Sequence, residues 1–208
     1  MPPAANAAAV KAALGRWAAA MQASAPELNE LDGRLGDGDL GATLEQCAAN
    51  VRAALRGMPD APDAVFKLCA LACAKASGSS FGTLLAQAFL VAARRIAGRA
   101  AIPAREFAPL LQDVIAALSA RGGASPGDKT MLDSLAAIAQ ALAGAPDDAD
   151  HAALARDAAQ RALDDFRDRP NRIGRARMFG DRSVGLDDPG MVAVLRMSQS
   201  FLSPRLVH

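Results

Sequence analysis

The chain has 208 residues, a length that suits one domain, and we expect residues 1–208 to fold as a single unit. Lysine plus arginine number 23 and aspartate plus glutamate number 22, so the net charge of +1 argues against a nucleic-acid-binding protein, which needs a concentrated basic surface. Hydrophobic residues make up 51% of the chain and aromatic residues only 4%, and this composition, rich in alanine and leucine, predicts helices rather than sheets.

Apolar residues recur every three or four positions in eight segments, and this spacing predicts an all-α fold of eight amphipathic helices. In the first segment the apolar face consists of Val10, Leu14, Trp17 and Met21. In chain order, we expect helices over about residues 4–24, 44–55, 63–75, 85–96, 107–118, 131–142, 152–166 and 191–202. Asp128 is the expected N-cap of the sixth helix, because its carboxylate can accept the free amide protons of a first helical turn.

Four of the connections between these helices are rich in glycine and contain 13 of the 17 glycines: residues 33–41, 78–82, 122–127 and 174–190. They follow the first, third, fifth and seventh helices, whereas ordinary turns follow the second, fourth and sixth. If neighbouring helices alternate in direction, all four Gly-rich loops emerge at the same end. The sequence therefore predicts a single-domain, up-and-down antiparallel bundle with a functional site in the loops at one end.

Three aspartates, Asp32, Asp37 and Asp39, lie within eight residues, in the first Gly-rich loop and directly before it. Carboxylates that crowd together repel one another unless a cation joins them, and hard oxygen ligands suit Mg²⁺ or Ca²⁺. The loop is consistent with Mg²⁺-nucleotide chemistry, and the alternative interpretation is an exposed acidic turn. The sequence contains no G-x-x-x-x-G-K-[ST] motif, which excludes a P-loop ATPase.

Two further loops carry groups suited to phosphate. Residues 76–82 offer small side chains and backbone amides at the start of a helix, where amides and the helix dipole bind anions, although a simple helix cap is the alternative. Residues 174–190 are long for a connection inside a bundle, a length typical of lids and binding loops. In that loop Arg175, Arg177 and Arg182 offer planar donors for phosphate.

Four motifs follow one another along the chain: L-D-x-x-x-G-D-G-D-x-G at 31–41, A-S-G-x-x-F-G-T at 76–83, R-G-x-A-x-P-G-D-K-T-M-x-D at 121–133 and G-R-A-x-x-x-G-x-R-S-x-G-x-x-D-P-G at 174–190. In this order they resemble the nucleotide-binding L subunit, or the equivalent C-terminal domain, of dihydroxyacetone kinases. The resemblance implies a closed barrel of eight up-and-down helices with ADP or ATP and Mg²⁺ at one end. It also implies a phosphotransferase of glycerol metabolism that acts by charge neutralisation and alignment.

The resemblance also assigns roles to individual residues. Two Mg²⁺ ions bridging the nucleotide phosphates would be held by Asp32, Asp37 and Asp39. The phosphates would be contacted by Leu40, Gly41, Ala42, Thr43, Ser77 and Gly78. The adenine side would be lined by Gly122 and Met131, and the pocket would be closed by Arg175, Asp188, Pro189 and Gly190. No catalytic side chain beyond these metal and phosphate ligands is implied.

The kinases that this chain resembles hold their ketone covalently on a histidine of a separate K subunit. The only histidines here are His151, expected in a surface turn at the opposite end, and His208. A dihydroxyacetone-binding K subunit is therefore the expected partner. The phosphoryl donor is either free ATP or a phosphocarrier protein that rephosphorylates bound ADP. For the assembly of the chain itself, a homodimer is one alternative.

The chain departs from the family at four positions: Leu40 and Leu186 stand where histidines are usual, and Ala74 and Lys75 where glycines are usual. A kinase for a different small sugar is therefore one alternative, and a non-catalytic nucleotide-binding regulatory module is another. A third alternative is the ATP-binding domain of a fatty-acid kinase, although that relative carries a long additional region.

The cysteines bear on the compartment. Cys47, Cys69 and Cys73 are an odd number without the spacing of a disulfide framework or a zinc site, so we expect free thiols in the core and a cytoplasmic location. The N-terminus has no basic region before its apolar stretch, so we expect no signal peptide. No segment has the continuous apolar run of a membrane span, so we expect no membrane partner.

Overall fold

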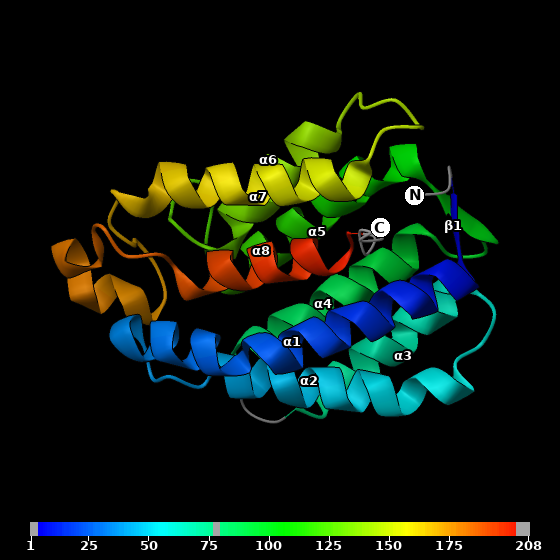
Figure 1. Cartoon of the computed structure of the whole chain (residues 1–208), viewed down its shortest axis with the longest axis horizontal. Helices are drawn as coiled ribbons and strands as arrows, with labels where there is room; N and C mark the ends of the chain where they lie inside the picture. Colours follow the sequence, from blue (N-terminus) through cyan, green and yellow to red (C-terminus); the bar gives the residue numbers. More distant parts are fainter. Residues whose placement is uncertain (1–3, 77–79, 203–208) are drawn as a thin grey trace, which may run out of the picture.

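Eight α-helices make up most of the residues that the computed structural model describes, 4–76 and 80–202 (Figure 1). They are α1 (Ala7–Leu35), α2 (Leu40–Ala54), α3 (Pro62–Ala74), α4 (Ser80–Arg95), α5 (Phe107–Gly122), α6 (Met131–Leu142), α7 (His151–Arg167) and α8 (Pro189–Ser200). The same residues include three 3-10 segments, η1 (Leu55–Gly57), η2 (Ala104–Glu106) and η3 (Arg175–Ser183), and two strands, β1 (Ala4–Asn6) and β2 (Ala101–Pro103). Among the helices of these residues, none combines the length and the apolar character that crossing a membrane requires.

The helices form a closed ring. Each helix packs against the next one along the chain, and α8 returns to pack against α1. Figure 1 shows the helices running back and forth along the long axis, with η3 beside the C-terminal end of α1. The predicted eight-helix up-and-down bundle is therefore confirmed, and short connections between antiparallel neighbours account for it.

Buried apolar side chains from every helix meet along the axis of the ring. The predicted face of α1 is buried as expected, and Trp17 packs edge-on against Phe89 of α4, with ring centroids 6.1 Å apart. All three cysteines are free and buried, which confirms them as core residues. Burial raises the pKa of the Cys69 thiol to about 12, so that thiol stays protonated and inert.

The first helix is longer than its predicted end at residue 24, and it continues through Pro26 to Leu35. A proline inside a helix removes one hydrogen bond and normally ends the helix. Here the apolar spacing continues beyond the proline, because Ala25, Leu28 and Leu35 are all buried. Packing of this face therefore outweighs the local cost, and the first Gly-rich loop shrinks to residues 36–39.

A small antiparallel ribbon was not expected from the sequence. Strand β1 pairs with β2, with Ala5 opposite Ile102, and both side chains are buried. The expectation of a helix from residue 4 and of a plain turn before residue 103 was therefore wrong. The ribbon forms because two apolar side chains on one face enter the core, and α1 begins only after Asn6, whose side chain accepts the Ala9 amide at 3.0 Å.

The predicted cap of the sixth helix was also wrong. Thr130, not Asp128, is the N-cap of α6, and its hydroxyl accepts the Leu132 amide at 3.2 Å. Asp133 completes a capping box by accepting the Thr130 amide at 2.8 Å. Asp128 lies two residues before Thr130 and accepts the Ser125 amide at 2.8 Å, so it orders the preceding loop instead.

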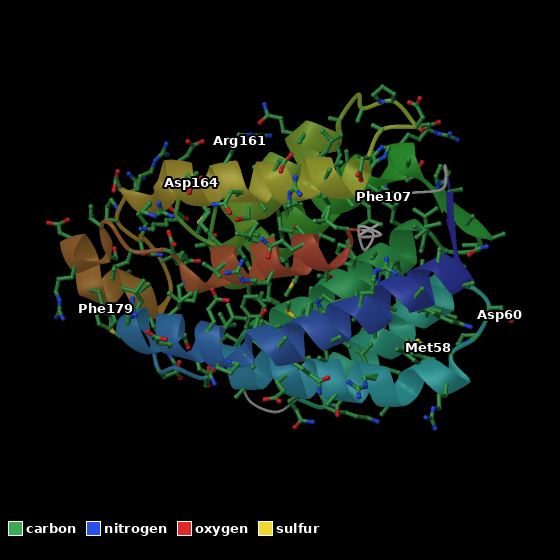
Figure 2. All side chains as sticks on the ribbon, in the orientation of Figure 1. Met58, Asp60, Phe107, Arg161, Asp164 and Phe179 are labelled. Atoms are coloured by element: carbon green, nitrogen blue, oxygen red, sulfur yellow. The ribbon has the colours of Figure 1, made fainter. Side chains whose placement is uncertain are left out.

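His151 is not the surface turn residue that the sequence suggested. It is the first residue of α7, it is buried, and its ring nitrogen Nδ1 lies 2.8 Å from the Ala149 carbonyl oxygen. Its ring also packs edge-on against Phe107 at 6.2 Å. Phe107 and Phe179 lie at opposite ends of the molecule (Figure 2), so His151 is at the far end from η3, as predicted.

Candidate functional site

A cavity of about 670 Å³ lies at one end of the ring, where the helix termini and Gly-rich loops meet. It is lined by the C-terminal ends of α1 and α5, the N-terminal ends of α2, α4, α6 and α8, and the start of η3. This arrangement agrees with the alternation of loops that the sequence predicts. Ten of the predicted site residues line the cavity: Asp32, Asp37, Asp39, Leu40, Gly122, Met131, Arg175, Asp188, Pro189 and Gly190.

The three predicted metal ligands are brought together. Carboxylate oxygens of Asp32, Asp37 and Asp39 all lie within 4.8 Å of one another. Three oxygen donors at this separation form the kind of set that Mg²⁺ prefers, with further positions open to water and phosphate oxygens. The chemistry of these donors therefore fits a divalent cation. The guanidinium of Arg175 contacts the Asp37 carboxylate and places a positive charge on the same cluster.

The junction between α1 and α2 holds the cluster in place. Asp32 is in the last turn of α1, and its Oδ2 accepts the amides of Asp39 at 2.9 Å and Leu40 at 3.2 Å. Asn29, one turn earlier, accepts the Ala42 amide at 3.0 Å. Two side chains of α1 thus cap the N-terminus of α2, where helical amides have no partner within the helix. Between the helices, Gly38 has a φ of +77°, which the tight reversal requires.

Three residues expected near phosphate take other positions. Of the described residues, Gly41, Ala42 and Thr43 are not among those that line the cavity. The Ala42 amide donates to Asn29, and the Thr43 amide donates to the Asp39 carbonyl oxygen at 2.9 Å. Gly41 instead lies where α2 meets α1, since a Cβ at this position would lie 2.0 Å from the Ala25 carbonyl oxygen.

The second Gly-rich loop contributes the start of α4. Ser80, Phe81 and Thr83 line the cavity, whereas the predicted phosphate contacts Ser77 and Gly78 lie outside the described residues. Of the arginines in the fourth loop, Arg175 lines the cavity, while Arg182 lies over the Phe179 ring at 5.8 Å.

Part of the cavity lining forms an apolar wall. Leu84, Leu118, Met131 and Ile173 form this wall, which suits the flat face of an aromatic base. Leu40 lines the same cavity next to the aspartates. The fourth-loop leucine, Leu186, lines a smaller neighbouring hollow of about 130 Å³ between α1 and the loop.

A buried polar network beneath the cavity was missed by the sequence analysis. Asn171 donates through Nδ2 to the Lys129 carbonyl oxygen and to Asp188 Oδ2, both at 2.8 Å, and its amide donates to Ser183 at 2.9 Å. Asp188 also caps α8 by accepting the Met191 amide at 2.9 Å. Lys129 falls inside the third motif, but its pattern gives no hint of burial, and Asn171 falls in no motif.

Asp188 differs chemically from the three exposed or half-buried aspartates. It is buried, and desolvation raises its pKa to about 6 in spite of hydrogen bonds from Met191 and Asn171 that favour the charged form. It therefore contributes a fixed acceptor at the wall of the cavity.

Comparison with known proteins gives one family. The DAK2 domain family matches residues 34–203. The ADP-binding subunit DhaL of the PEP-dependent dihydroxyacetone kinase of Escherichia coli is 28% identical over 177 residues, covering 83% of this chain and 84% of the relative. Human triokinase/FMN cyclase is 32% identical over 182 residues, covering 84% of this chain and 31% of the relative.

A solved structure shows the same fold. The dihydroxyacetone kinase of C. freundii, in complex with AMP-PNP and Mg²⁺, superposes with a TM-score of 0.75 and 26% identity over 96% of this chain and 34% of that protein. The chain thus spans most of the bacterial subunit but only about a third of the larger enzymes, at 31% and 34% of their lengths.

Proposed function

The chain belongs to the DAK2 domain family, and from that premise we propose that it is the nucleotide-binding, phosphoryl-donor subunit of a dihydroxyacetone-type kinase. It binds ADP or ATP together with Mg²⁺ at the loop end of the bundle and passes phosphate to a short ketose held by a partner subunit. The observation that carries this proposal is the set of three aspartates whose carboxylate oxygens lie within 4.8 Å of one another beside the cavity.

Each part of the site has a role in this proposal. Asp32, Asp37 and Asp39 would hold Mg²⁺, which when bound neutralises phosphate charge. Arg175 contacts Asp37 and lines the cavity, so its guanidinium can pair with Asp37 or with a phosphate oxygen. The apolar wall at Met131 would take the base. The residues of the site thus align the phosphates and stabilise charge, which is most of what phosphoryl transfer needs from a protein.

The size of the cavity supports a nucleotide. Its volume of about 670 Å³ lies within the range of roughly 300–1,000 Å³ that is typical of small-molecule sites. Its lining also offers groups suited to both ends of a nucleotide, since it includes carboxylates and an arginine as well as apolar side chains.

The acceptor and the donor are the finer parts of the proposal. Relatives act on dihydroxyacetone in E. coli and on L-erythrulose in Mycolicibacterium smegmatis, by their names, so we propose a ketose of three or four carbons. The relatives from E. coli and Lactococcus lactis are ADP-binding subunits of PEP- or PTS-dependent kinases. A tightly bound ADP that a phosphocarrier recharges is therefore one form of the donor, and exchangeable ATP is the other.

Calorimetric titration of MgADP tests the site directly. Asp37→Ala should weaken Mg²⁺-dependent ADP affinity at least about tenfold, because even residues one shell beyond a metal change its affinity by 10–100-fold. Asp37 suits this test, since its side chain is 42% exposed. The matched control is Asp60→Ala, an exposed aspartate at the other end of the molecule (Figure 2). Equal affinities in the two variants would refute the metal assignment.

A transfer assay tests the activity. The chain is combined with a dihydroxyacetone-binding K subunit, and phosphorylation of dihydroxyacetone and erythrulose is followed with either ATP or a phosphocarrier as donor. We expect transfer to one ketose from one donor. Binding of MgADP without transfer to either ketose would contradict the kinase proposal and indicate a nucleotide-binding regulatory module.

A further inference from the structure

Lys129 is a buried lysine whose partners are backbone groups. Only 1% of this residue is exposed to solvent. Its Nζ donates to the carbonyl oxygens of Arg167 at 2.9 Å, Arg169 at 2.8 Å and Ser183 at 2.9 Å. An ammonium has three N–H donors, so these three acceptors use all of them. Lys129 also has a φ of +60°, the only positive φ of a non-glycine residue in the described part of the chain.

The three acceptors lie at the two ends of one loop. Arg167 is the last residue of α7, Arg169 follows two residues later, and Ser183 is the last residue of η3. The two ends of the segment that they bound, residues 168–183, are therefore held close to the same ammonium group. Asn171 adds a second closure, since its amide donates to the Ser183 hydroxyl oxygen while its side chain donates to the Lys129 carbonyl oxygen.

This closed segment forms part of the cavity wall, which we call its cover. Ile173, Gly174, Arg175 and Ala176 lie inside it and all four line the cavity. Lys129 is also adjacent in sequence to Thr130 and Met131, which line the cavity too, so one residue joins this part of the lining to the cover.

Opposing effects act on the positive charge of the Lys129 ammonium. Burial lowers the pKa of Lys129, while nearby carboxylates, Asp188 first among them, oppose that effect. Carbonyl groups at the C-terminal end of α7 carry the negative end of the helix dipole, which suits a cation. A neutral side chain of the same length would remove all three of these hydrogen bonds. The carbonyl oxygens of Arg167 and Ser183 would keep the amides of Gly185 and Leu186 as donors, whereas that of Arg169 would lose the lysine, and each unmade hydrogen bond is costly in such a site.

We propose that Lys129 is a positioning residue for the nucleotide site: its ammonium closes the base of the 168–183 segment and so holds Arg175 and the rest of the cover over the bound nucleotide. The identity of the ligand rests on the proposed function, whereas the closure of the segment rests on the hydrogen bonds of Lys129, together with those of Asn171 and of the Gly185 amide to the Arg167 carbonyl oxygen.

The test compares Lys129→Met, which keeps the length and apolar stem, with the control Lys67→Met, which removes a lysine that pairs with Asp63 on the surface of α3. Hydrogen exchange without ligand should become at least about tenfold faster in residues 168–183 of Lys129→Met, and unchanged in α2 and α3. MgADP affinity should fall at least about tenfold in the same variant. A role in packing alone predicts neither change, because methionine preserves the packing.

A second variant restores the missing charge. Lys129→Ala lacks the atoms that n-propylammonium supplies, so millimolar n-propylammonium should slow exchange in residues 168–183 and recover MgADP affinity. Tetramethylammonium, which has no N–H donor, should do neither. If Lys129→Met does not fold, this rescue decides the proposal by itself. Failure of rescue, or exchange and affinity in Lys129→Met equal to those of Lys67→Met, would overturn it.

The wild-type measurements separate the two proposals. Wild-type protein that fails to bind MgADP would refute the proposed function, and exchange in residues 168–183 would then still decide whether Lys129 closes the segment. Wild-type protein that binds MgADP, together with an unaffected Lys129→Met, would refute the positioning role and leave the proposed function standing.

Discussion

Replacing Gly41 by alanine tests whether the close approach of α1 and α2 sets the geometry of the site. Gly41 is in the first turn of α2, against α1. A Cβ there would lie 2.0 Å from the Ala25 carbonyl oxygen and 2.8 Å from Asn29 Oδ1. The Ala25 oxygen belongs to the helix backbone and cannot turn aside as a flexible side chain would.

The expected cost follows from that overlap. Cβ contacts under 3.0 Å essentially never occur, so the two helices must separate locally by about 1 Å. Overpacking of this kind costs about 1–3 kcal/mol, and the rigid neighbour places Gly41→Ala at the upper end, about 3 kcal/mol. The separation also strains the bond from the Ala42 amide to Asn29, which is worth about 1 kcal/mol.

Urea denaturation provides the assay, with Gly15→Ala as the matched control. Gly15 is inside α1, where a Cβ would meet only Leu55 Cδ1 at 3.9 Å, an ordinary contact. Gly15→Ala should therefore raise the free energy of unfolding by about 0.5–1 kcal/mol, because alanine favours the helix. If Gly41→Ala proves as stable as Gly15→Ala, the close approach of the helices is not required and the reasoning fails.

Two further predictions concern capping and pH. Burial raises the pKa of Asp188 from 3.8 to about 6, so the folded state binds this proton more tightly than the unfolded state does. The stability that protonated Asp188 confers is complete below pH 4 and is lost as the pH rises towards 6, a change of about 3 kcal/mol. In urea denaturation, the free energy of unfolding of the wild type relative to Asp188→Asn should fall by that amount between pH 4 and pH 7, and parallel curves would contradict the assignment. Thr130→Ala should lower the free energy of unfolding by about 1 kcal/mol through loss of the α6 cap. Asp128→Ala should cost less in the same measurement, and the reverse order would restore Asp128 as the cap.

Local sequence patterns were sufficient for the helices and for the end of the bundle that carries the site. The apolar stripe at Val10, Leu14 and Trp17 depends only on spacing, and the alternation of loops depends only on helix order. The true end of α1 did not follow from local pattern, because a proline signals termination locally while the buried Leu28 and Leu35 belong to tertiary packing.

Within the candidate site, the cluster of aspartates was predictable from the sequence, but the buried residues that hold the neighbouring loops were not. Asp32, Asp37 and Asp39 lie within eight residues, so glycines between them suffice to bring them together. Lys129 and Asn171 act through partners that lie 12 to 54 residues away in sequence, and no short pattern reports such contacts. The close approach at Gly41 was likewise not predictable, because its nearest neighbour, the Ala25 carbonyl oxygen, belongs to another helix.

The hydrogen bonds of Asp32 have a consequence for the cation binding that we propose. One of its oxygens is already fixed by two amides of α2, so folding itself immobilises this carboxylate and orients its other oxygen. The entropy of ordering that side chain is lost when the protein folds, and a cation arriving later does not lose it again. Folding thus removes part of the entropic cost of binding a cation at Asp32. Mutation of Asp32 would therefore destabilise the fold and weaken the proposed ligand site together.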